Sequence, residues 1–169
     1  MSRAAGLWAR VGVATGVSAG FLLLLAPSEP ASRVPWPVAA LAGVGCGVAL
    51  YVVVTRCRPR LPACRRSASV AVGTQAFLGL LAANEEIVWR RVVLGELLGA
   101  GALVAVLGST IGFALVHRSR RKLQLATGAV FGGLYLSTGV LAASVAAHWA
   151  YNALVGALVE RRVRARVAR

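Results

Sequence analysis

Six long runs of apolar residues, separated by short polar segments, set the pattern of the chain. A helix needs about 20 mainly apolar residues to cross the ~30 Å hydrocarbon core of a bilayer, and about 17 to 25 is the workable range. The first, second and last runs have this length, whereas the fourth and fifth are shorter and need flanking Gly, Ser or Phe residues. The pattern predicts an all-α, polytopic integral membrane bundle of about six transmembrane helices, at 7–26, 38–55, 67–98, 102–116, 123–137 and 141–159.

The first run shares features with a cleaved signal peptide, since Arg3 and Arg10 lie near its start and a Pro- and Ser-containing segment follows it. Its apolar stretch is longer than that of a usual signal peptide, and no clean Ala-x-Ala cleavage site follows. We therefore interpret this run as a retained membrane anchor.

The amino-acid composition supports a membrane location. Residues of the AVILMFWYC set make up 58% of the 169 residues, and charged residues only 14%, against about a quarter in soluble domains. The chain has no Asp and a single lysine, so its formal net charge of +14 comes almost entirely from arginine. This composition excludes a disordered chain, which needs low hydrophobicity, and it disfavours an ordinary soluble enzyme.

The basic residues fall in short clusters between the apolar runs and not along an amphipathic stripe, which disfavours a nucleic-acid partner. Cytoplasmic loops of membrane proteins are enriched in Lys and Arg. A cytoplasmic N-terminus places 16 of the 19 basic residues on the cytoplasmic side and leaves Arg33, Arg90 and Arg91 for the far side or the membrane interior. The sequence therefore predicts that both termini are cytoplasmic.

Ionisable residues at membrane depth are few, and they are candidates for function because a charge in a bilayer is expensive. Glu86 and Arg90 are four residues apart, which places them on one helix face as an ion pair. Glu85 points about 100° away, and the residue four positions after it is Trp89, so this carboxylate is left free to react. The alternative is that both glutamates only mark the membrane surface.

Two further pairs of residues stand at helical spacing. Phe113 and His117 share one face at the end of the fourth run, and His148 and Asn152 share one face of the last run. The alternatives to a functional role are a capping or interfacial role for His117 and interhelical hydrogen bonding for His148 and Asn152.

A turn at Gly101 would bring two of these residues together. Glu85 and His117 are each sixteen residues from Gly101, so an antiparallel helical hairpin returns them to one level. His148 needs a tilted or broken helix to join them. A carboxylate with an imidazole suits the activation of water, and a second imidazole with an amide suits the stabilisation of an oxyanion.

The three motifs, in this order, resemble those of the CPBP family, the type II CAAX prenyl endopeptidases and Abi or bacteriocin-processing membrane proteins. The motifs are Glu85-Glu86-x-x-x-Arg90, Phe113-x-x-x-His117 and His148-x-x-x-Asn152. The stretch 131–139 also resembles the connecting span of the family, and the resemblance covers roughly 84–155. One departure is Arg91, because many members have glycine after the motif arginine.

The resemblance implies a glutamic intramembrane endopeptidase, a peptide hydrolase that needs no cofactor and no metal. Glu85 would activate water with His117 as its partner, and His148 with Asn152 would form the oxyanion site. The supporting residues would be Glu86, Arg90 and Phe113.

Three other functions remain open from the sequence. A zinc protease would use Glu85, His117 and His148 as ligands, although no H-E-x-x-H motif is present. A non-catalytic immunity or scaffold protein would keep the fold and bind a partner in the membrane. A proton-coupled transporter also uses buried Glu and His residues, but it would usually contain inverted repeats, and no internal repeat is found.

The sequence divides into two N-terminal spans with an Arg-rich cytoplasmic loop at 1–66, a catalytic core at 67–160 and a basic cytoplasmic tail at 161–169. The scarcity of lysine and the abundance of Ala, Val, Arg and Gly are typical of a high-GC bacterial genome. We therefore expect a bacterial cell membrane as the location, the lipid bilayer as a partner, and a membrane peptide or protein as the substrate.

Overall fold

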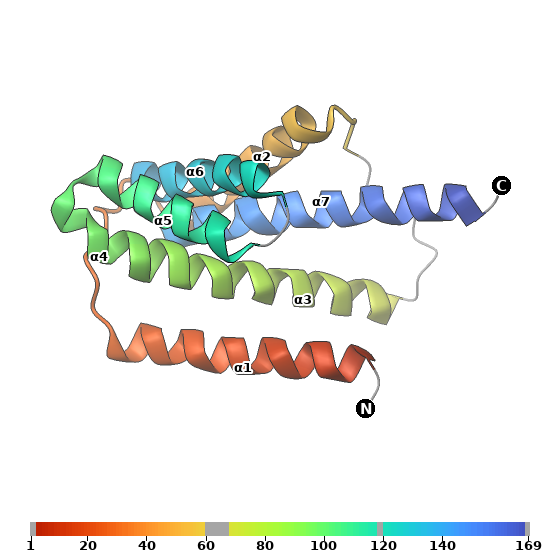
Figure 1. Cartoon of the computed structure of the whole chain (residues 1–169), viewed down its shortest axis with the longest axis horizontal. Helices are drawn as coiled ribbons and strands as arrows, with labels where there is room; N and C mark the ends of the chain where they lie inside the picture. Colours follow the sequence, from red (N-terminus) through yellow and green to blue (C-terminus); the bar gives the residue numbers. More distant parts are fainter. Residues whose placement is uncertain (1–2, 60–67, 118–119, 168–169) are drawn as a thin grey trace.

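The computed structural model describes residues 3–59, 68–117 and 120–167, and all regular structure in these ranges is helical (Figure 1). This confirms the all-α fold class. The helices are α1 (Arg3–Leu24), α2 (Trp36–Thr55), α3 (Ala68–Glu86), the π-helix η1 (Ile87–Leu94), α4 (Gly95–Leu97), the 3₁₀ turn η2 (Leu98–Ala100), α5 (Ala102–Val116), α6 (Arg121–Thr138) and α7 (Leu141–Val167).

Three of the described helices, α1, α2 and α7, are long and apolar enough to cross a membrane. The helix α5 is apolar but has only 15 residues. Large apolar side chains cover the outside of the bundle, as lipid contact requires, and Leu23, Leu41 and Val53 are 85%, 73% and 74% exposed. The protein is therefore an integral membrane helical bundle, and the figure of six spans stays a prediction.

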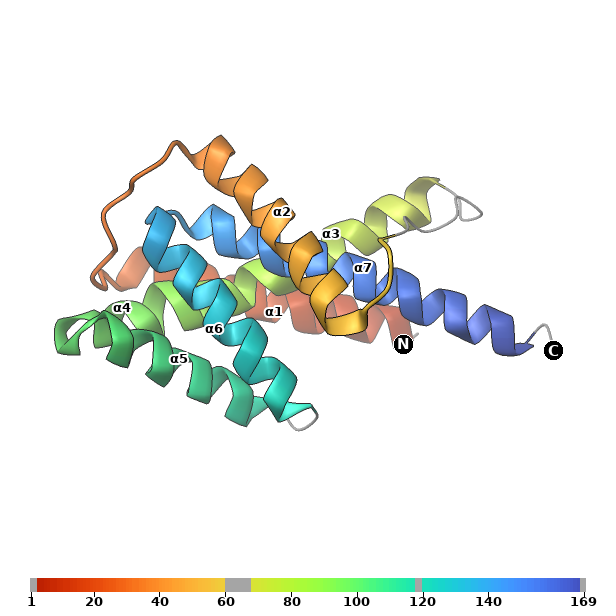
Figure 2. The same ribbon diagram turned by 90° about the horizontal axis from the view of Figure 1, so that it is seen from above.

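The helices form a layered bundle in which α3 lies between α1 and α7 (Figure 1). The most extensive contact is between α2 and α7, which cross diagonally when the molecule is seen from above (Figure 2). The hairpin of α5 and α6 packs beside them, and α5 also contacts η1. The N-terminal end of α1 and the C-terminal end of α7 lie at one end of the bundle (Figure 1).

Two glycines allow α2 and α7 to approach closely. A Cβ atom on Gly43 would collide with the main-chain oxygen of Ala143, and one on Gly47 would collide with that of Ala147. Small residues four apart let helix backbones come together in membranes, where hydrophobic attraction between helices is absent. The position of α7, and of the residues that follow Ala147, therefore depends on α2.

The predicted turn at Gly101 is present. Gly101 has a φ of 107°, a region that suits glycine, and its N–H donates to the Leu98 oxygen at 2.9 Å. The helical stretch from α3 to η2 and the helix α5 form the arms of a hairpin around it. The stretch is not one regular α-helix as expected, because the π-helix η1 begins directly after Glu86, and such segments are frequent at functional sites.

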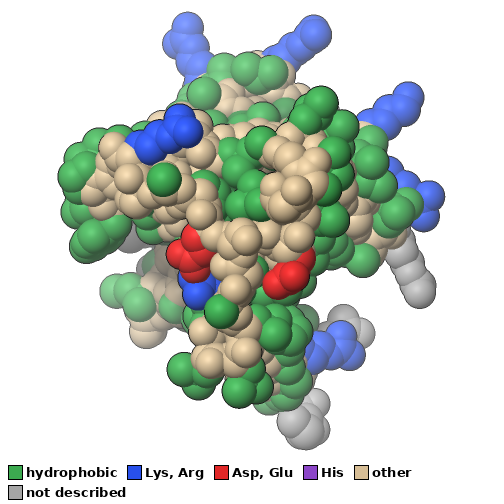
Figure 3. All heavy atoms as spheres, turned by 90° about the vertical axis from the view of Figure 1, so that its left-hand side faces the viewer, with side chains coloured by type: hydrophobic (Ala, Val, Ile, Leu, Met, Phe, Trp, Pro, Cys, Tyr) green, Lys and Arg blue, Asp and Glu red, His purple; other side chains and the backbone are tan. Residues whose placement is uncertain are grey.

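The connection between α1 and α2 closes the end of the bundle that lies opposite both termini. Arg33 N–H donates to the Thr138 oxygen at 2.9 Å, and Glu29 forms an ion pair with Arg91 of η1. Figure 3 views this end and shows acidic side chains near its centre. Arg91 therefore connects the segment between α1 and α2 to η1.

Candidate active site

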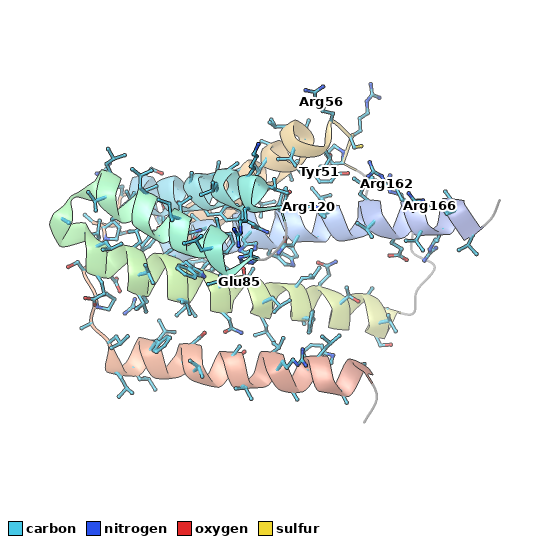
Figure 4. All side chains as sticks on the ribbon, in the orientation of Figure 1. Tyr51, Arg56, Glu85, Arg120, Arg162 and Arg166 are labelled. Carbon is cyan, nitrogen blue, oxygen red and sulfur yellow. The ribbon has the colours of Figure 1, made fainter. Side chains whose placement is uncertain are left out.

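Glu85 lies in the last turn of α3, where this helix faces the C-terminal end of α5 (Figure 4). Its side chain is 34% exposed. One carboxylate oxygen, Oε2, is 3.9 Å from Nε2 of His117 and 3.8 Å from Nε2 of His148. The structure therefore brings together the carboxylate and both imidazoles, which come from three different helical segments.

His117 follows α5 directly, and a hydrogen bond within its own turn fixes its ring. Its Nδ1 lies 2.7 Å from the Phe113 carbonyl oxygen. A carbonyl oxygen only accepts, so Nδ1 carries the proton and, in the neutral ring, Nε2 presents a lone pair towards Glu85. The rings of Phe113 and His117 are in contact, with centroids 4.4 Å apart. Phe113, through its carbonyl oxygen and its ring, therefore holds the imidazole of His117 in one orientation.

His148 is held from both its edge and its face. Nδ1 lies 2.9 Å from Oε1 of the buried Glu86, to which it donates a hydrogen bond. The ring stacks on Phe131 with centroids 4.9 Å apart, and its side chain is 7% exposed. This bond to Glu86 leaves Nε2 directed towards Glu85. The carboxylate of Glu86 thus fixes the orientation of the ring.

The predicted ion pair of Glu86 and Arg90 is present below the surface of the site. Arg90 Nε donates to Glu86 Oε2 at 3.0 Å, and both side chains are fully buried. Arg90 also lies 3.5 Å from the Ser109 hydroxyl and 5.4 Å from the centre of the Phe113 ring. Glu86 thus balances one cation and orients His148, while Glu85 stays available to the cavity.

Asn152 lies one turn after His148 on α7 and faces the same cavity. The cavity has a volume of about 120 Å³, enough for several water molecules. Four helical segments contribute its walls. The residues that line it are Glu85, Phe113, His117, Leu123, Gln124, Thr127, Phe131, His148, Tyr151 and Asn152. All four residues that the sequence predicts as catalytic therefore reach one cavity.

Sequence reasoning missed several polar residues that lie at the cavity or beside the buried pair of Glu86 and Arg90. Ser109 and Ser144 are fully buried, and they stand four residues before Phe113 and His148. The helical spacing that linked the motifs could have found both. Gln124 and Thr127 are isolated polar residues in an apolar run, and that pattern was the available signal. In the part of the chain that the structure describes, no three His, Cys, Asp or Glu side chains are arranged to hold a metal ion.

The fold and the cavity define an integral membrane protein with a carboxylate and two imidazoles at its centre. The family profile described as Type II CAAX prenyl endopeptidase Rce1-like matches residues 68–154, just over half of the chain. The chain belongs to this family, which confirms the resemblance drawn from the three motifs. No curated protein matches the chain. No solved structure matches it either.

Proposed function

We propose that this chain is an intramembrane endopeptidase that hydrolyses a peptide bond through water activated by Glu85 and His117. The observation that carries the proposal is the placement of Glu85 Oε2 at 3.8 and 3.9 Å from two imidazole nitrogens beside a cavity. Such a separation is too long for a direct hydrogen bond and suits a bridging water. Membership of a protease family supports the same class of reaction.

The first step follows from which groups donate and which accept. Glu85 and the Nε2 lone pair of neutral His117 both accept hydrogen bonds, so a water between them donates one O–H to each. Glu85 takes one proton as the water oxygen bonds to the carbonyl carbon of the substrate. The same proton then passes to the leaving nitrogen when the C–N bond breaks.

The negative charge on the former carbonyl oxygen needs hydrogen-bond donors, and α7 brings two such side chains to the cavity. The Asn152 side chain supplies one N–H. His148 supplies another from Nε2 when both ring nitrogens carry protons, and the hydrogen bond from Nδ1 to Glu86 holds the ring in place. Donors placed in this way are often the largest single contribution to catalysis.

The substrate in this proposal is a peptide segment that reaches the site from the membrane. The family description names prenyl endopeptidases, but prenylated tails are not expected in a bacterium with a high-GC genome. A bacteriocin-like peptide or a membrane regulator suits the expected bacterial source better.

Replacement of Glu85 with alanine is expected to lower kcat by about 10²–10⁴-fold, which is the usual contribution of a general base. The assay is cleavage of a membrane-peptide library by the purified protein in liposomes, followed by mass spectrometry. The matched control is Glu96→Ala, since Glu96 is exposed in α4 and lies outside the cavity. EDTA is added in a parallel series.

Each result of this assay separates one function from another. Cleavage that needs Glu85, survives EDTA and is unaffected by Glu96→Ala supports the glutamic mechanism. Activity lost in EDTA and restored by zinc would favour a zinc protease that uses Glu85, His117 and His148. Cleavage that persists in Glu85→Ala would refute the role of Glu85 as the base. An inactive wild-type protein would favour the immunity or scaffold function.

We propose that the end of the bundle with both termini faces the cytoplasm. Arg56, Arg162 and Arg166 lie towards this end (Figure 4), and the remainder of the predicted Arg-rich loop at 60–67, with Arg118, lies outside the described residues. Fusions of alkaline phosphatase and green fluorescent protein to each terminus provide the test. Fluorescence without phosphatase activity at both termini is expected, and phosphatase activity at either would contradict this orientation.

A further inference from the structure

Two polar side chains of α6 line the active-site cavity, to which α3 contributes Glu85 and α7 contributes His148. Gln124 and Thr127 lie one turn apart, and both line the cavity. Thr127 is only 2% exposed. Its hydroxyl Oγ1 lies 3.3 Å from the Gln124 main-chain oxygen and 3.4 Å from the Gln124 side-chain oxygen Oε1. The single hydroxyl proton of Thr127 is shared between these two oxygens, and the amide of Gln124 lies with Oε1 towards Thr127.

This arrangement leaves the amide nitrogen of Gln124 directed away from Thr127. Within residues 3–59, 68–117 and 120–167, no acceptor is paired with Nε2. An amide donor costs free energy when it leaves water without a partner, and the cost is larger at membrane depth than at a protein surface. A ligand that fills the cavity and displaces its water must therefore supply an acceptor to this donor.

We infer that Gln124 binds the peptide backbone of the substrate by donating from Nε2 to a backbone carbonyl. The inference rests on the proposed function, because it takes the occupant of the cavity to be a peptide. An extended peptide has unpaired carbonyl oxygens on both sides, since it has no helical hydrogen bonds. Asn152 and His148 serve the carbonyl under attack, and Gln124 on α6 serves a neighbouring carbonyl.

Gln124 hydrogen-bonds to the substrate backbone and not to a substrate side chain. It therefore favours an extended peptide over a helical one. The carbonyls of a transmembrane helix are already paired within the helix. Only a segment that is unfolded at the site offers a carbonyl to Gln124. The substrate class is therefore a membrane peptide with a locally extended stretch at the bond that is cut.

The test compares Gln124→Leu with Gln75→Leu, the same change in α3 at a residue outside the cavity lining. The loss of one hydrogen bond is expected to raise KM by about threefold to tenfold and to leave kcat within about twofold. Thr127→Val is expected to raise KM in the same direction because the Gln124 amide is then free to turn. Thr127→Ser keeps the hydroxyl and is expected to restore the wild-type KM.

The outcomes separate this inference from the proposed function. A wild-type protein that cleaves peptides, with an unchanged KM in Gln124→Leu, overturns the inference and leaves the function standing. If the wild-type protein cleaves nothing, binding of fluorescent 20-residue Leu/Ala peptides with a central Gly-Pro is measured in liposomes. Weaker binding in Gln124→Leu than in Gln75→Leu then supports the inference without the enzyme function. Equal binding, or none by the wild-type protein, overturns it.

Discussion

Replacement of Arg90 with methionine is expected to lower the free energy of unfolding by about 3–5 kcal/mol. Arg90 is the cation 3.0 Å from Glu86, and both side chains are fully buried. Methionine has similar length and no charge, so the variant leaves a buried carboxylate without its partner. The measurement is equilibrium unfolding in mixed SDS and detergent micelles, followed by circular dichroism. A loss this large is a substantial part of the stability of most proteins.

The double variant Glu86→Gln/Arg90→Met tests the cause of that loss. It removes both charges and keeps a side-chain oxygen that accepts from His148. We expect it to be more stable than Arg90→Met alone, because replacing both members of a buried pair is often neutral. Arg162→Met is the control for loss of an exposed arginine. Equal stabilities of Arg90→Met and Arg162→Met would show that the buried pair does not hold the fold.

The hairpin around Gly101 could be predicted from the sequence because its determinants are local. A glycine between two apolar runs predicts a turn, and equal spacing on both sides places Glu85 and His117 at one level. The ion pair of Glu86 and Arg90 followed from helical spacing alone. The apolar runs predicted the bounds of α5 correctly, but α7 continues to Val167, eight residues beyond the predicted end at 159. The division of the chain at residues 66 and 160 stays a prediction.

The position of His148 could not be predicted, because it depends on contacts between distant segments. Its ring reaches the site through the crossing of α7 with α2 and through the hydrogen bond to Glu86, 62 residues away. The pattern of apolar residues in the sequence predicts neither the angle at which α7 crosses α2 nor the π-helix after Glu86. The orientation of Gln124 towards the cavity could not be predicted for the same reason, since it depends on how α6 packs against α5.

Replacement of Gly47 with alanine is expected to lower kcat by about 10²-fold. The new methyl group would meet the carbonyl oxygen of Ala147, so α2 and α7 must move apart at that level. His148 is the next residue of α7, and a displacement of about 1 Å near a catalytic group costs about that factor. Overpacking is also expected to lower the free energy of unfolding by about 1–3 kcal/mol. Both quantities are measured on purified protein, by peptide cleavage and by unfolding in micelles.

Variants at two other glycines of α2 distinguish displacement of His148 from a general loss of stability. Gly45→Ala makes the same change on the outer face, where nothing lies within 4 Å of the new methyl group. The gain of about 1 kcal/mol in helix propensity is common to both variants and cancels in the comparison. Gly43→Ala creates the same clash one turn further from His148. If both variants lose the same stability but Gly47→Ala has the lower kcat, the loss of kcat is caused by displacement of His148. Wild-type kcat in both would show that the contact with α2 does not position this histidine.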